Sequence, residues 1–452
     1  MNSCMRIASR IGLTCLIYWR MKCLQRVLFF CVCGFVVSLV LLLKRLHYEV
    51  ESANASNSYL WTLRRVVGMH FGNRESPKPK ATHDVKTEKP RITIITLPQS
   101  TPSPWEEYKT WVESTQLYTK ESLADGTMRR LLNSMSTKPI VKALVGYRGT
   151  QLKATFILRG EQKVVFKPMR YSRDTVITGN PYSGYDRHNA EIAAFYLDGL
   201  LGFRRAPPVT GRIVDLTQDV LPVAEKKLSD TFFRDENTGN VCFYGVCYYC
   251  KRSDPACAKG HTMEGSVTLW LPAERKLKTW PHPWRRTYVE GRKARWEINE
   301  NYCKAVVTGV PYNKGRRLLD VMDTAVFDYL IGNADRHHYE TFERDGNDGM
   351  LLHLDNAKSF GNPNHDERSI LAPIYQCCLI RQQTWRRLVL WARNPKSLGD
   401  RLREAMSSDF VAPVLDDRHY DAINRRLKKV VDTIRNCISK RGENNVLRND
   451  GF

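Results

Sequence analysis

Residues 330–361 read LIGNADRHHYETFERDGNDGMLLHLDNAKSFG, an apolar end followed by acids, adjacent histidines and turn residues. Apolar residues at helical spacing predict an amphipathic helix over 317–331, and Gly332 is a typical residue just beyond the end of a helix. Asp335 lies in the loop that follows. The apolar run MLLHLDN then predicts a short strand that ends at Asp355. This order of helix, acidic loop and strand narrows the choice of fold.

Three kinds of site are open to this stretch. A metal site on His337 and His338 is disfavoured, because adjacent side chains diverge and the chain has no HExxH spacing. A purely structural loop would pair its acids with Arg336 and Arg344. The third reading is phosphoryl transfer, which needs one acid at the acceptor hydroxyl and further acids that hold a divalent cation on the phosphates.

The order of charged residues along the chain favours phosphoryl transfer. Asp335 has the place of the acid at the acceptor, while Glu340 and Asp355 follow at positions where protein kinases carry metal ligands. Lys167 comes directly after the strand-like VVF, and Glu191 lies in the helical HNAEIAAF. Alone, each would be read as a solvated surface residue. Together and in this order, they indicate a kinase.

Hydrophobic periodicity predicts a β-rich first half and a helical second half. Strands are expected over 152–158 and 163–167, a helix over 188–203, and a further strand over 207–216. The glycine-containing loop 146–151 precedes them. Its backbone amides could face phosphate, although a plain hairpin turn is the simpler reading. The chain is mostly helical after Ser369, so the fold class is α+β with a small β-rich lobe and a larger helical lobe.

Net charge restricts the partners. The chain carries 70 Lys or Arg against 47 Asp or Glu, for a net charge of +23. Residues 1–50 hold seven Lys or Arg and one Glu, which leaves 63 basic and 46 acidic residues and +17 elsewhere. Such a surface favours polyanions, phosphates among them. The sequence has no zinc-finger spacing and no aromatic RNA-binding box, so no nucleic-acid partner is expected.

Residues 27–43, VLFFCVCGFVVSLVLLL, form an unbroken apolar run at the short end of the membrane-spanning range. Five basic residues and no acid precede it, which predicts a cytosolic N-terminus and a lumenal remainder. The alternative is a cleaved signal peptide with the small residues SANA, 52–55, as its site. Lys44 and Arg45, which lie between, favour an uncleaved type II anchor.

Residues 44–103 are polar and rich in proline, lysine, serine and threonine, as in a flexible stem. Asn54-Ala55-Ser56 is a glycosylation sequon within it.

Cysteine usage agrees with a lumenal domain. Five of the 13 cysteines precede residue 34, and the remaining even number predicts four disulfides in an oxidising compartment. Zinc is the competing reading, because Cys247 and Cys250 form a CxxC motif. The sequence pattern leaves the pairing open, although the adjacent Cys377 and Cys378 are expected to have different partners.

Several longer motifs resemble the secretory-pathway kinases of the family with sequence similarity 20. They are IGNADRHHYE, LDNAKSFGNP, DERSILAPIYQCC, FYGVCYYC, MEGSVTLWLP and HPWRRTY, within a resemblance that runs over about residues 105–437. It implies an atypical two-lobed protein-kinase-like fold in a type II protein of the Golgi membrane with a lumenal catalytic domain. LDNAKSFGNP, CYYC and Trp385 resemble the family's sugar kinase.

That likeness implies transfer of the ATP γ-phosphate to the 2-hydroxyl of xylose in the glycosaminoglycan–protein linkage region. Manganese is the implied metal, with magnesium as the alternative. Two other functions stay open: a secretory protein serine kinase, and a non-catalytic pseudokinase-type activator. Because Lys167, Glu191, Asp335 and Asp355 are all present, the pseudokinase is disfavoured.

The resemblance also implies roles for single residues. Asp335 resembles the catalytic base, Asp355 a metal ligand, and Lys167 the lysine on the ATP phosphates. Glu191 resembles the helix partner of that lysine or a second metal ligand. The other implied ATP contacts are Gln151, Thr268, Leu269, Trp270, Leu271 and Glu340. Trp385 and Phe360 are candidates for stacking on sugar rings, with core packing as the simpler role of each.

Finally, the resemblance implies a disulfide pairing and a division of the chain. The implied disulfides are Cys242–Cys257, Cys247–Cys250, Cys303–Cys377 and Cys378–Cys437. The expected segments are a cytoplasmic tail (1–26), the anchor (27–43), the stem (44–103), the N-lobe (104–266), the C-lobe (267–440) and a C-terminal tail (441–452).

Overall fold

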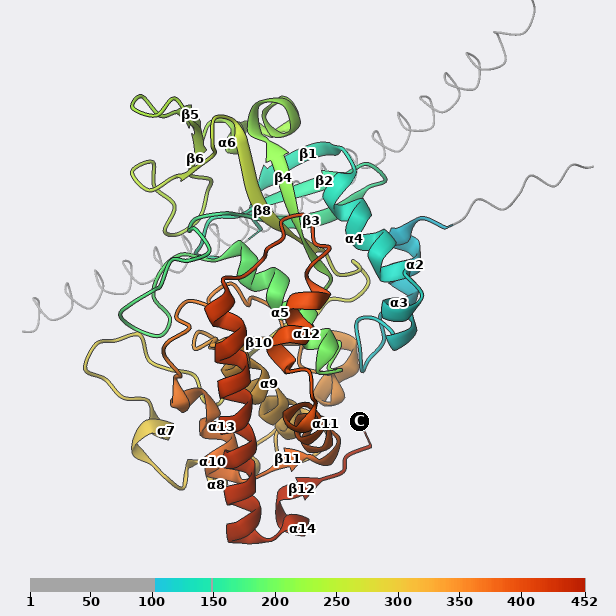
Figure 1. Ribbon diagram of the computed structural model, residues 1–452, viewed down its shortest axis with the longest axis vertical. Helices are drawn as coiled ribbons and strands as arrows, with labels where there is room; N and C mark the ends of the chain where they lie inside the picture. The colour runs from blue at the N-terminus through green and yellow to red at the C-terminus, as the bar shows by residue number, and fades with distance from the viewer. Residues whose placement is uncertain (1–101, 148, 452) are drawn as a thin grey trace, which may run out of the picture. The chain divides into compact units, whose positions relative to one another are not determined.

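In the computed structural model, residues 102–147 and 149–451 are described (Figure 1). The predicted anchor, almost all of the predicted stem and the sequon at Asn54 lie outside these residues. Within them, no helix combines the length and the hydrophobicity that crossing a membrane requires.

The β-rich part is built on one five-stranded antiparallel sheet. Its order is β1 (Ile140–Val145), β2 (Ala154–Leu158), β3 (Gln162–Pro168), β8 (Thr262–Leu269) and β4 (Val209–Asp215). The strands over 152–158, 163–167 and 207–216 are thus confirmed. Phe156 of β2 and Phe166 of β3 stack with their ring centroids 4.9 Å apart, which fixes the register of this hairpin from one face.

Some helices come before this sheet in the sequence, and some pack against it. α4 (Thr127–Thr137) lies against β4, and α5 (His188–Leu200) lies against β4 and β8. α2 (Pro104–Trp111) ends before the buried Leu117 and Tyr118. The remaining elements here are α3 (Lys120–Ala124), α6 (Lys226–Ser229), and the short helical turns η1 (Leu216–Val220) and η2 (Leu221–Val223).

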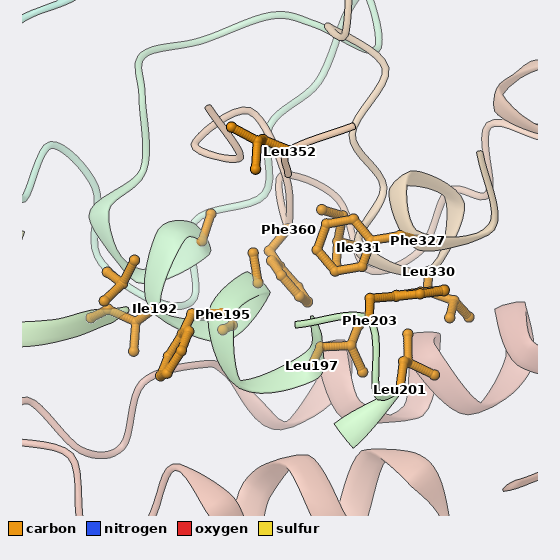
Figure 2. Packing of buried hydrophobic residues seen from close by; sticks show 14 of the residues in the cluster. Ile192, Phe195, Leu197, Leu201, Phe203, Phe327, Leu330, Ile331, Leu352 and Phe360 are labelled. Carbon is orange, nitrogen blue, oxygen red and sulfur yellow. The ribbon is translucent and has the colours of Figure 1, made fainter. Parts of the chain in front are cut away.

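α5 joins the two halves of the structure through a common core. It is buried almost all round near its start, because Ala190, Ala193 and Ala194 allow neighbouring elements to approach closely. Figure 2 shows its apolar side chains beside those of α9, with Phe203 between the two helices. The rings of Phe203 and Phe327 meet edge to face at 6.3 Å. A core of this kind holds residues of α5 at a fixed position relative to those of α9.

The second half is mainly helical, as predicted. α9 (Arg317–Ile331) has the predicted bounds, and Gly332 ends it in the left-handed region with φ 72°. Long α13 (Asp417–Arg441) packs against α9 and α12. The other helices are α7 (Arg295–Ile298), α8 (Tyr302–Val307), η3 (Glu343–Asp348), η4 (Arg368–Leu371), α10 (Ala372–Cys377), α11 (Gln382–Arg393), α12 (Leu398–Ala405) and α14 (Glu443–Val446). Two small sheets pair β9 (Leu277–Pro281) with β10 (His338–Phe342), and β11 (Ile380–Arg381) with β12 (Leu447–Arg448).

The structure differs from prediction in the segment MLLHLDN. It makes only a single β-bridge, between Leu352 and Glu340, rather than a strand. The next backbone amide, of His353, donates instead to the carbonyl of Arg205, and Asp355 turns into the left-handed region with φ 56°. The apolar residues are buried, but they fill the core without extending a sheet.

The proposed lobe boundary between residues 266 and 267 falls inside β8, which continues to Leu269. Since β8 pairs with both β3 and β4, the chain leaves the first sheet only after that residue.

All four implied disulfides are present: Cys242–Cys257, Cys247–Cys250, Cys303–Cys377 and Cys378–Cys437. The first joins neighbouring strands of a small sheet of β5 (Phe232–Arg234), β6 (Val241–Phe243) and β7 (Ala256–Cys257). With both cysteines of the CxxC motif bonded to each other, the motif is not a zinc site.

Candidate active site

Lys167 contacts three carboxylates at the end of β3. Its ammonium nitrogen Nζ lies 2.7 Å from Oε1 of Glu191, 2.9 Å from Oδ2 of Asp186 and 2.9 Å from Oδ1 of Asp355. The side chains of Lys167 and Glu191 are each 6% exposed, whereas that of Asp355 is 75% exposed. These four residues are called the Lys167 cluster below. The structure therefore brings together the three residues that sequence placed in order, and adds Asp186.

Electrostatics in the cluster favour the charged forms of Lys167 and Asp355. Burial disfavours the charged ammonium, but Asp186, Asp355 and Glu191 outweigh burial and hold the pKa of Lys167 well above its ordinary value. Lys167 in turn is the largest cause that lowers the pKa of Asp355. One ammonium against three carboxylates leaves the cluster negatively charged.

Two backbone arrangements position the acids of the cluster. Asp355 lies at φ 56°, so the chain turns directly after it, and the amide of Asn356 donates to Oε2 of Glu191 at 3.2 Å. Arg187, adjacent to Asp186, donates from its Nε to the carbonyl of Ser359 at 2.7 Å. The amide of Arg187 donates to the carbonyl of Ala357 at 2.9 Å. The start of α5 and the segment after Asp355 are thus fixed to each other.

Asp186 was missed by sequence reasoning. It lies two residues before α5, in the sequence YDRHNAEIAAF, and its buried neighbours His188 and Glu191 gave the only local signal. An isolated acid just before a helix is common, because it interacts favourably with the helix N-terminus, so it does not by itself indicate a functional site. Only the fold places it against Lys167.

Arg336 connects the loop of Asp335 to the segment of Asp355. Its guanidinium forms two hydrogen bonds with Asp328 of α9, at 2.6 and 2.8 Å. It also donates to the carbonyl of Leu354 at 2.6 Å and to the side chain of Asn356 at 2.7 Å. The structural reading of this loop expected Arg336 to neutralise the loop's own acids. Instead, Arg336 pairs with Asp328 of α9, whereas Arg344 does pair with an acid of the same stretch, Asp345.

Asp335 is held by neutral groups. The hydroxyl of Tyr288 donates to its Oδ1, and its own amide donates to Oδ1 of Asn333 at 3.1 Å. The nearest basic group is His337, with Nδ1 3.8 Å from Oδ1. Burial raises the pKa of Asp335, while the hydrogen bond from Tyr288 acts in the opposite direction. A carboxylate without a strong cationic partner can accept a proton, as a general base must.

The remaining predicted ATP residues lie in β10, at and after the end of β8, and in the loop between β1 and β2. Glu340 lies in β10 opposite Thr279, and burial raises its pKa. Thr268 and Leu269 end β8, and the amide of Trp270 donates to the carbonyl of Lys163 at 3.1 Å. Predicted residues Gln151, in the loop between β1 and β2, and Leu271, just after β8, are each half-buried. Their roles in nucleotide binding stay predictions.

Of the two candidates for sugar stacking, Phe360 is a core residue, and the role of Trp385 stays a prediction. Phe360 is 3% exposed and packs edge to face on His419, at 5.7 Å between ring centroids. Trp385 of α11 is half-buried against the hydrophobic core. Near Asp335, Tyr288 is 47% exposed, whereas Trp284 and Trp296, which line a small cavity there, are each 5% exposed.

The donors of the cluster fit a divalent cation shared with phosphates. Within residues 102–147 and 149–451, no three His, Cys, Asp or Glu side chains are arranged as a complete metal site. A kinase metal does not need one, because one or two carboxylates bind it together with phosphate oxygens and water. Asp355, exposed, fits this role best. Glu191 already uses Oε1 for Lys167 and Oε2 for the amide of Asn356.

Comparisons with known proteins agree with this geometry. The family model described as "Golgi casein kinase, C-terminal, Fam20" matches residues 103–446. Human glycosaminoglycan xylosylkinase is 56% identical over 348 residues, which are 77% of this chain and 83% of that protein. A structure of hydra Fam20 with sugar is 49% identical and superposes with a TM-score of 0.75 over 78% of this chain and 100% of that one.

A crystal structure of the Golgi casein kinase with Mn/ADP bound is 39% identical. It has a TM-score of 0.73 and covers 77% of this chain and 84% of its own. The family model, the sequence identities and the folds all agree over most of the chain, and the chain therefore belongs to the Fam20 family.

Proposed function

We propose that this protein is an ATP-dependent glycosaminoglycan xylosylkinase. It transfers the γ-phosphate to the 2-hydroxyl of xylose in the linkage region of proteoglycans and so promotes glycosaminoglycan synthesis. The observation that carries the proposal is the placement of Asp335, which has no strong cationic partner, on a loop that Arg336 joins to the segment of Asp355. The 56% identity to the human xylosylkinase supports xylose over a protein acceptor.

In this reaction, Oδ1 or Oδ2 of Asp335 accepts the proton of the xylose hydroxyl as the oxygen attacks the γ-phosphorus. One oxygen–phosphorus bond forms, the bond from the γ-phosphorus to the leaving ADP breaks, and ADP departs with the electron pair. Tyr288 orients the carboxylate of Asp335 before the attack. Lys167, held by Glu191 and Asp186, presents its charge to the phosphates.

Manganese, with magnesium as the alternative, would neutralise phosphate charge when bound at Asp355. The crystal structure of the related casein kinase holds Mn/ADP, which supports this choice.

The acceptor is a neutral sugar, and Tyr288, which is 47% exposed and donates to Asp335, places an aromatic ring next to the proposed base. His337, whose Nδ1 lies 3.0 Å from the hydroxyl of Tyr288, adds a polar group at the same place. Rings with a few convergent polar groups are the usual lining of a small-molecule site. The hydra relative in complex with a sugar supports this class of acceptor.

We also propose that the catalytic domain lies in the Golgi lumen, on a single-pass type II anchor. The apolar run 27–43 and its basic N-terminal flank support the anchor. The four disulfides support an oxidising compartment.

In the test, the purified full-length protein is incubated with labelled ATP, manganese and one of two acceptors, a galactosyl-xyloside or casein. Label on the xyloside that disappears in Asp335→Asn supports the proposal. Label on casein alone would identify a protein kinase. If neither acceptor is labelled while ATP still binds, the protein is a non-catalytic nucleotide-binding partner and the proposal is wrong.

A further inference from the structure

Lys153 lies at the end of the loop between β1 and β2, one residue before β2 begins. Its side chain folds back along this loop. A Cβ atom built at Gly146 would lie 2.4 Å from Cγ of Lys153, and one built at Gly149 would lie 2.5 Å from its Nζ. The two glycines therefore leave the space that the lysine side chain occupies. This is a specific packing arrangement, unlike that of a lysine extended into solvent.

The ammonium of Lys153 has no fixed partner in the part of the chain that the structure describes. No hydrogen bond or ion pair joins it to any residue of 102–147 or 149–451. It is half-buried, and its charge interacts with Lys167, Asp355, Asp186 and Glu191. Ala154 pairs with Phe166 in the register of β2 and β3, so Lys153, one residue before, lies opposite Lys167 and near its cluster.

A second cation is needed at this place because of the charge of the Lys167 cluster. Three carboxylates surround the single ammonium of Lys167, so the cluster repels a polyphosphate. A bound divalent ion reduces this repulsion but does not remove the charge of a triphosphate. A lysine that is already desolvated and unpaired gains a charge-assisted hydrogen bond when phosphate arrives.

The loop that holds Lys153 is itself supported by the disulfide loop Cys247–Cys250. The amide of Tyr249, inside that disulfide, donates to the carbonyl of Thr150 at 3.1 Å. Gly245, just before it, lies against Leu152, since a Cβ there would be 2.5 Å from Cδ1 of the leucine. The loop is therefore positioned from outside, which lowers the entropy lost when it binds a ligand.

We propose that Lys153 is a second phosphate-binding residue, which contacts the terminal phosphates of the nucleotide from the loop between β1 and β2. This inference rests on the proposed function, because it assumes a nucleoside triphosphate at the Lys167 cluster. The inference gives the loop between β1 and β2 a role in phosphate binding, which its two glycines alone do not indicate. A solvated lysine would instead contribute nothing to nucleotide affinity.

The test measures calorimetric binding of ATP, ADP and AMP, with and without manganese, to full-length protein carrying Lys153→Ala. Affinity for ATP should fall about 10- to 100-fold, as expected for loss of a charged hydrogen bond. The loss should be smaller for ADP and absent for AMP. Lys153→Arg keeps the charge and should retain most of the affinity.

Lys142→Ala is the matched control, because it removes an exposed lysine of β1 in the same sheet. Unchanged ATP affinity in Lys153→Ala, or an equal loss for AMP, would overturn the inference. If Lys153→Ala does not fold, judged by its thermal melt, Lys153→Met and Lys153→Arg give the same comparison. A wild-type protein that fails to bind ATP would count against the proposed function rather than against Lys153 alone.

Discussion

The hydroxyl of Tyr288 donates a hydrogen bond to Oδ1 of Asp335, across 47 residues of sequence. The same hydroxyl lies 3.0 Å from Nδ1 of His337. Partial burial and the negative charge of Asp335 raise the pKa of Tyr288, so the phenol stays protonated and remains a donor. The carboxylate is therefore oriented by a neutral group, which leaves its negative charge available to take a proton.

Replacement of Asp335 tests its role as base. In Asp335→Asn, kcat for xyloside phosphorylation should fall about 10²- to 10⁴-fold, the usual contribution of a positioned general base. ATP affinity, measured by calorimetry, should stay close to that of the wild type, because Asp335 is not a member of the Lys167 cluster. A parallel loss of ATP binding would show that Asp335 holds the nucleotide instead.

The pH dependence of kcat tests the pair of Tyr288 and Asp335. Asp335 acts as a base only when ionised, and burial raises its pKa, so activity should fall on acidification at a higher pH than for an ordinary aspartate. Tyr288→Phe removes a hydrogen bond that lowers this pKa, so the acid limb should move to still higher pH. Tyr375→Phe, a change at an exposed tyrosine, is the control and should leave the profile in place. An unmoved limb in Tyr288→Phe would refute the coupling.

Loss of the central ammonium should destabilise the protein in a pH-dependent way. Lys167→Met leaves Asp186, Glu191 and Asp355 facing one another. The free energy of unfolding at neutral pH, in EDTA, should fall by about 3 kcal/mol, the effect of breaking a buried ion pair.

The loss in Lys167→Met should shrink as the pH is lowered, because crowded carboxylates take up protons and their repulsion disappears. Denaturant unfolding at several pH values measures it. Equal losses at every pH would mean that packing of the lysine side chain, and not its charge, is what matters.

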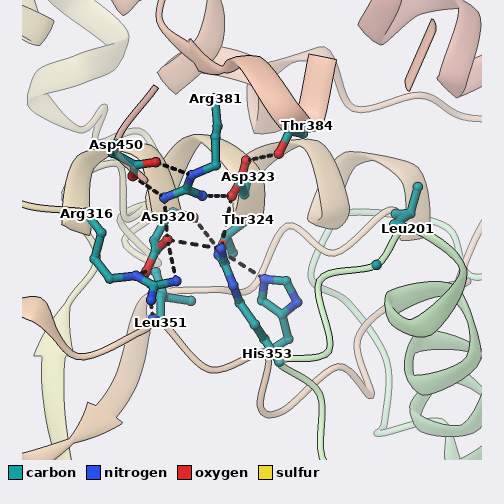
Figure 3. Close-up of polar contacts among 12 residues, drawn as sticks. Leu201, Arg316, Asp320, Asp323, Thr324, Leu351, His353, Arg381, Thr384 and Asp450 are labelled. Atoms are coloured by element: carbon teal, nitrogen blue, oxygen red, sulfur yellow. Dashed lines mark hydrogen bonds and ion pairs between the residues drawn. The ribbon is translucent and has the colours of Figure 1, made fainter. Parts of the chain in front are cut away.

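A buried network joins the C-terminal segment to α9 (Figure 3). Arg381 contacts Asp320 and Asp323 of α9, and its Nε and a terminal nitrogen donate to Asp450 at 2.9 and 2.6 Å. Asp450→Asn should lower the free energy of unfolding by about 1 to 3 kcal/mol, because a buried arginine loses a charged partner. Asp432→Asn breaks an exposed pair of α13 and should cost less than about 0.5 kcal/mol. Equal effects would show that Asp450 is only a surface residue.

Removal of the Cys247–Cys250 disulfide tests whether this disulfide positions the loop between β1 and β2 for nucleotide binding. In the double variant Cys247→Ser and Cys250→Ser, ATP affinity should fall about fivefold, the effect of about one backbone hydrogen bond, that of Tyr249 to Thr150. The melting temperature should change little, because so short a loop restricts the unfolded chain weakly. A large fall in melting temperature with normal ATP affinity would show a structural role for the disulfide alone.

Local patterns were enough for much of the fold. The helix over 317–331 and its end at Gly332 were predictable, because apolar spacing and a glycine at the left-handed position are properties of adjacent residues. The segment MLLHLDN was wrongly read as a strand, because hydrophobicity reports burial, whereas a strand needs a neighbour with open hydrogen-bonding groups. There the chain pairs with Glu340 once and then turns toward Arg205.

By itself, the sequence determined the residues of the candidate site in their order, Lys167, Glu191, Asp335 and Asp355, and the resemblance that implied their roles and the disulfide pairing. Only the tertiary structure decided which side chains meet. Asp186 joins Lys167, Tyr288 joins Asp335, and Lys153 lies opposite Lys167 without a partner within the described part of the chain. The physical reason is that charge interactions depend on distance in space. Elements far apart in the sequence set that distance, so local composition does not predict it.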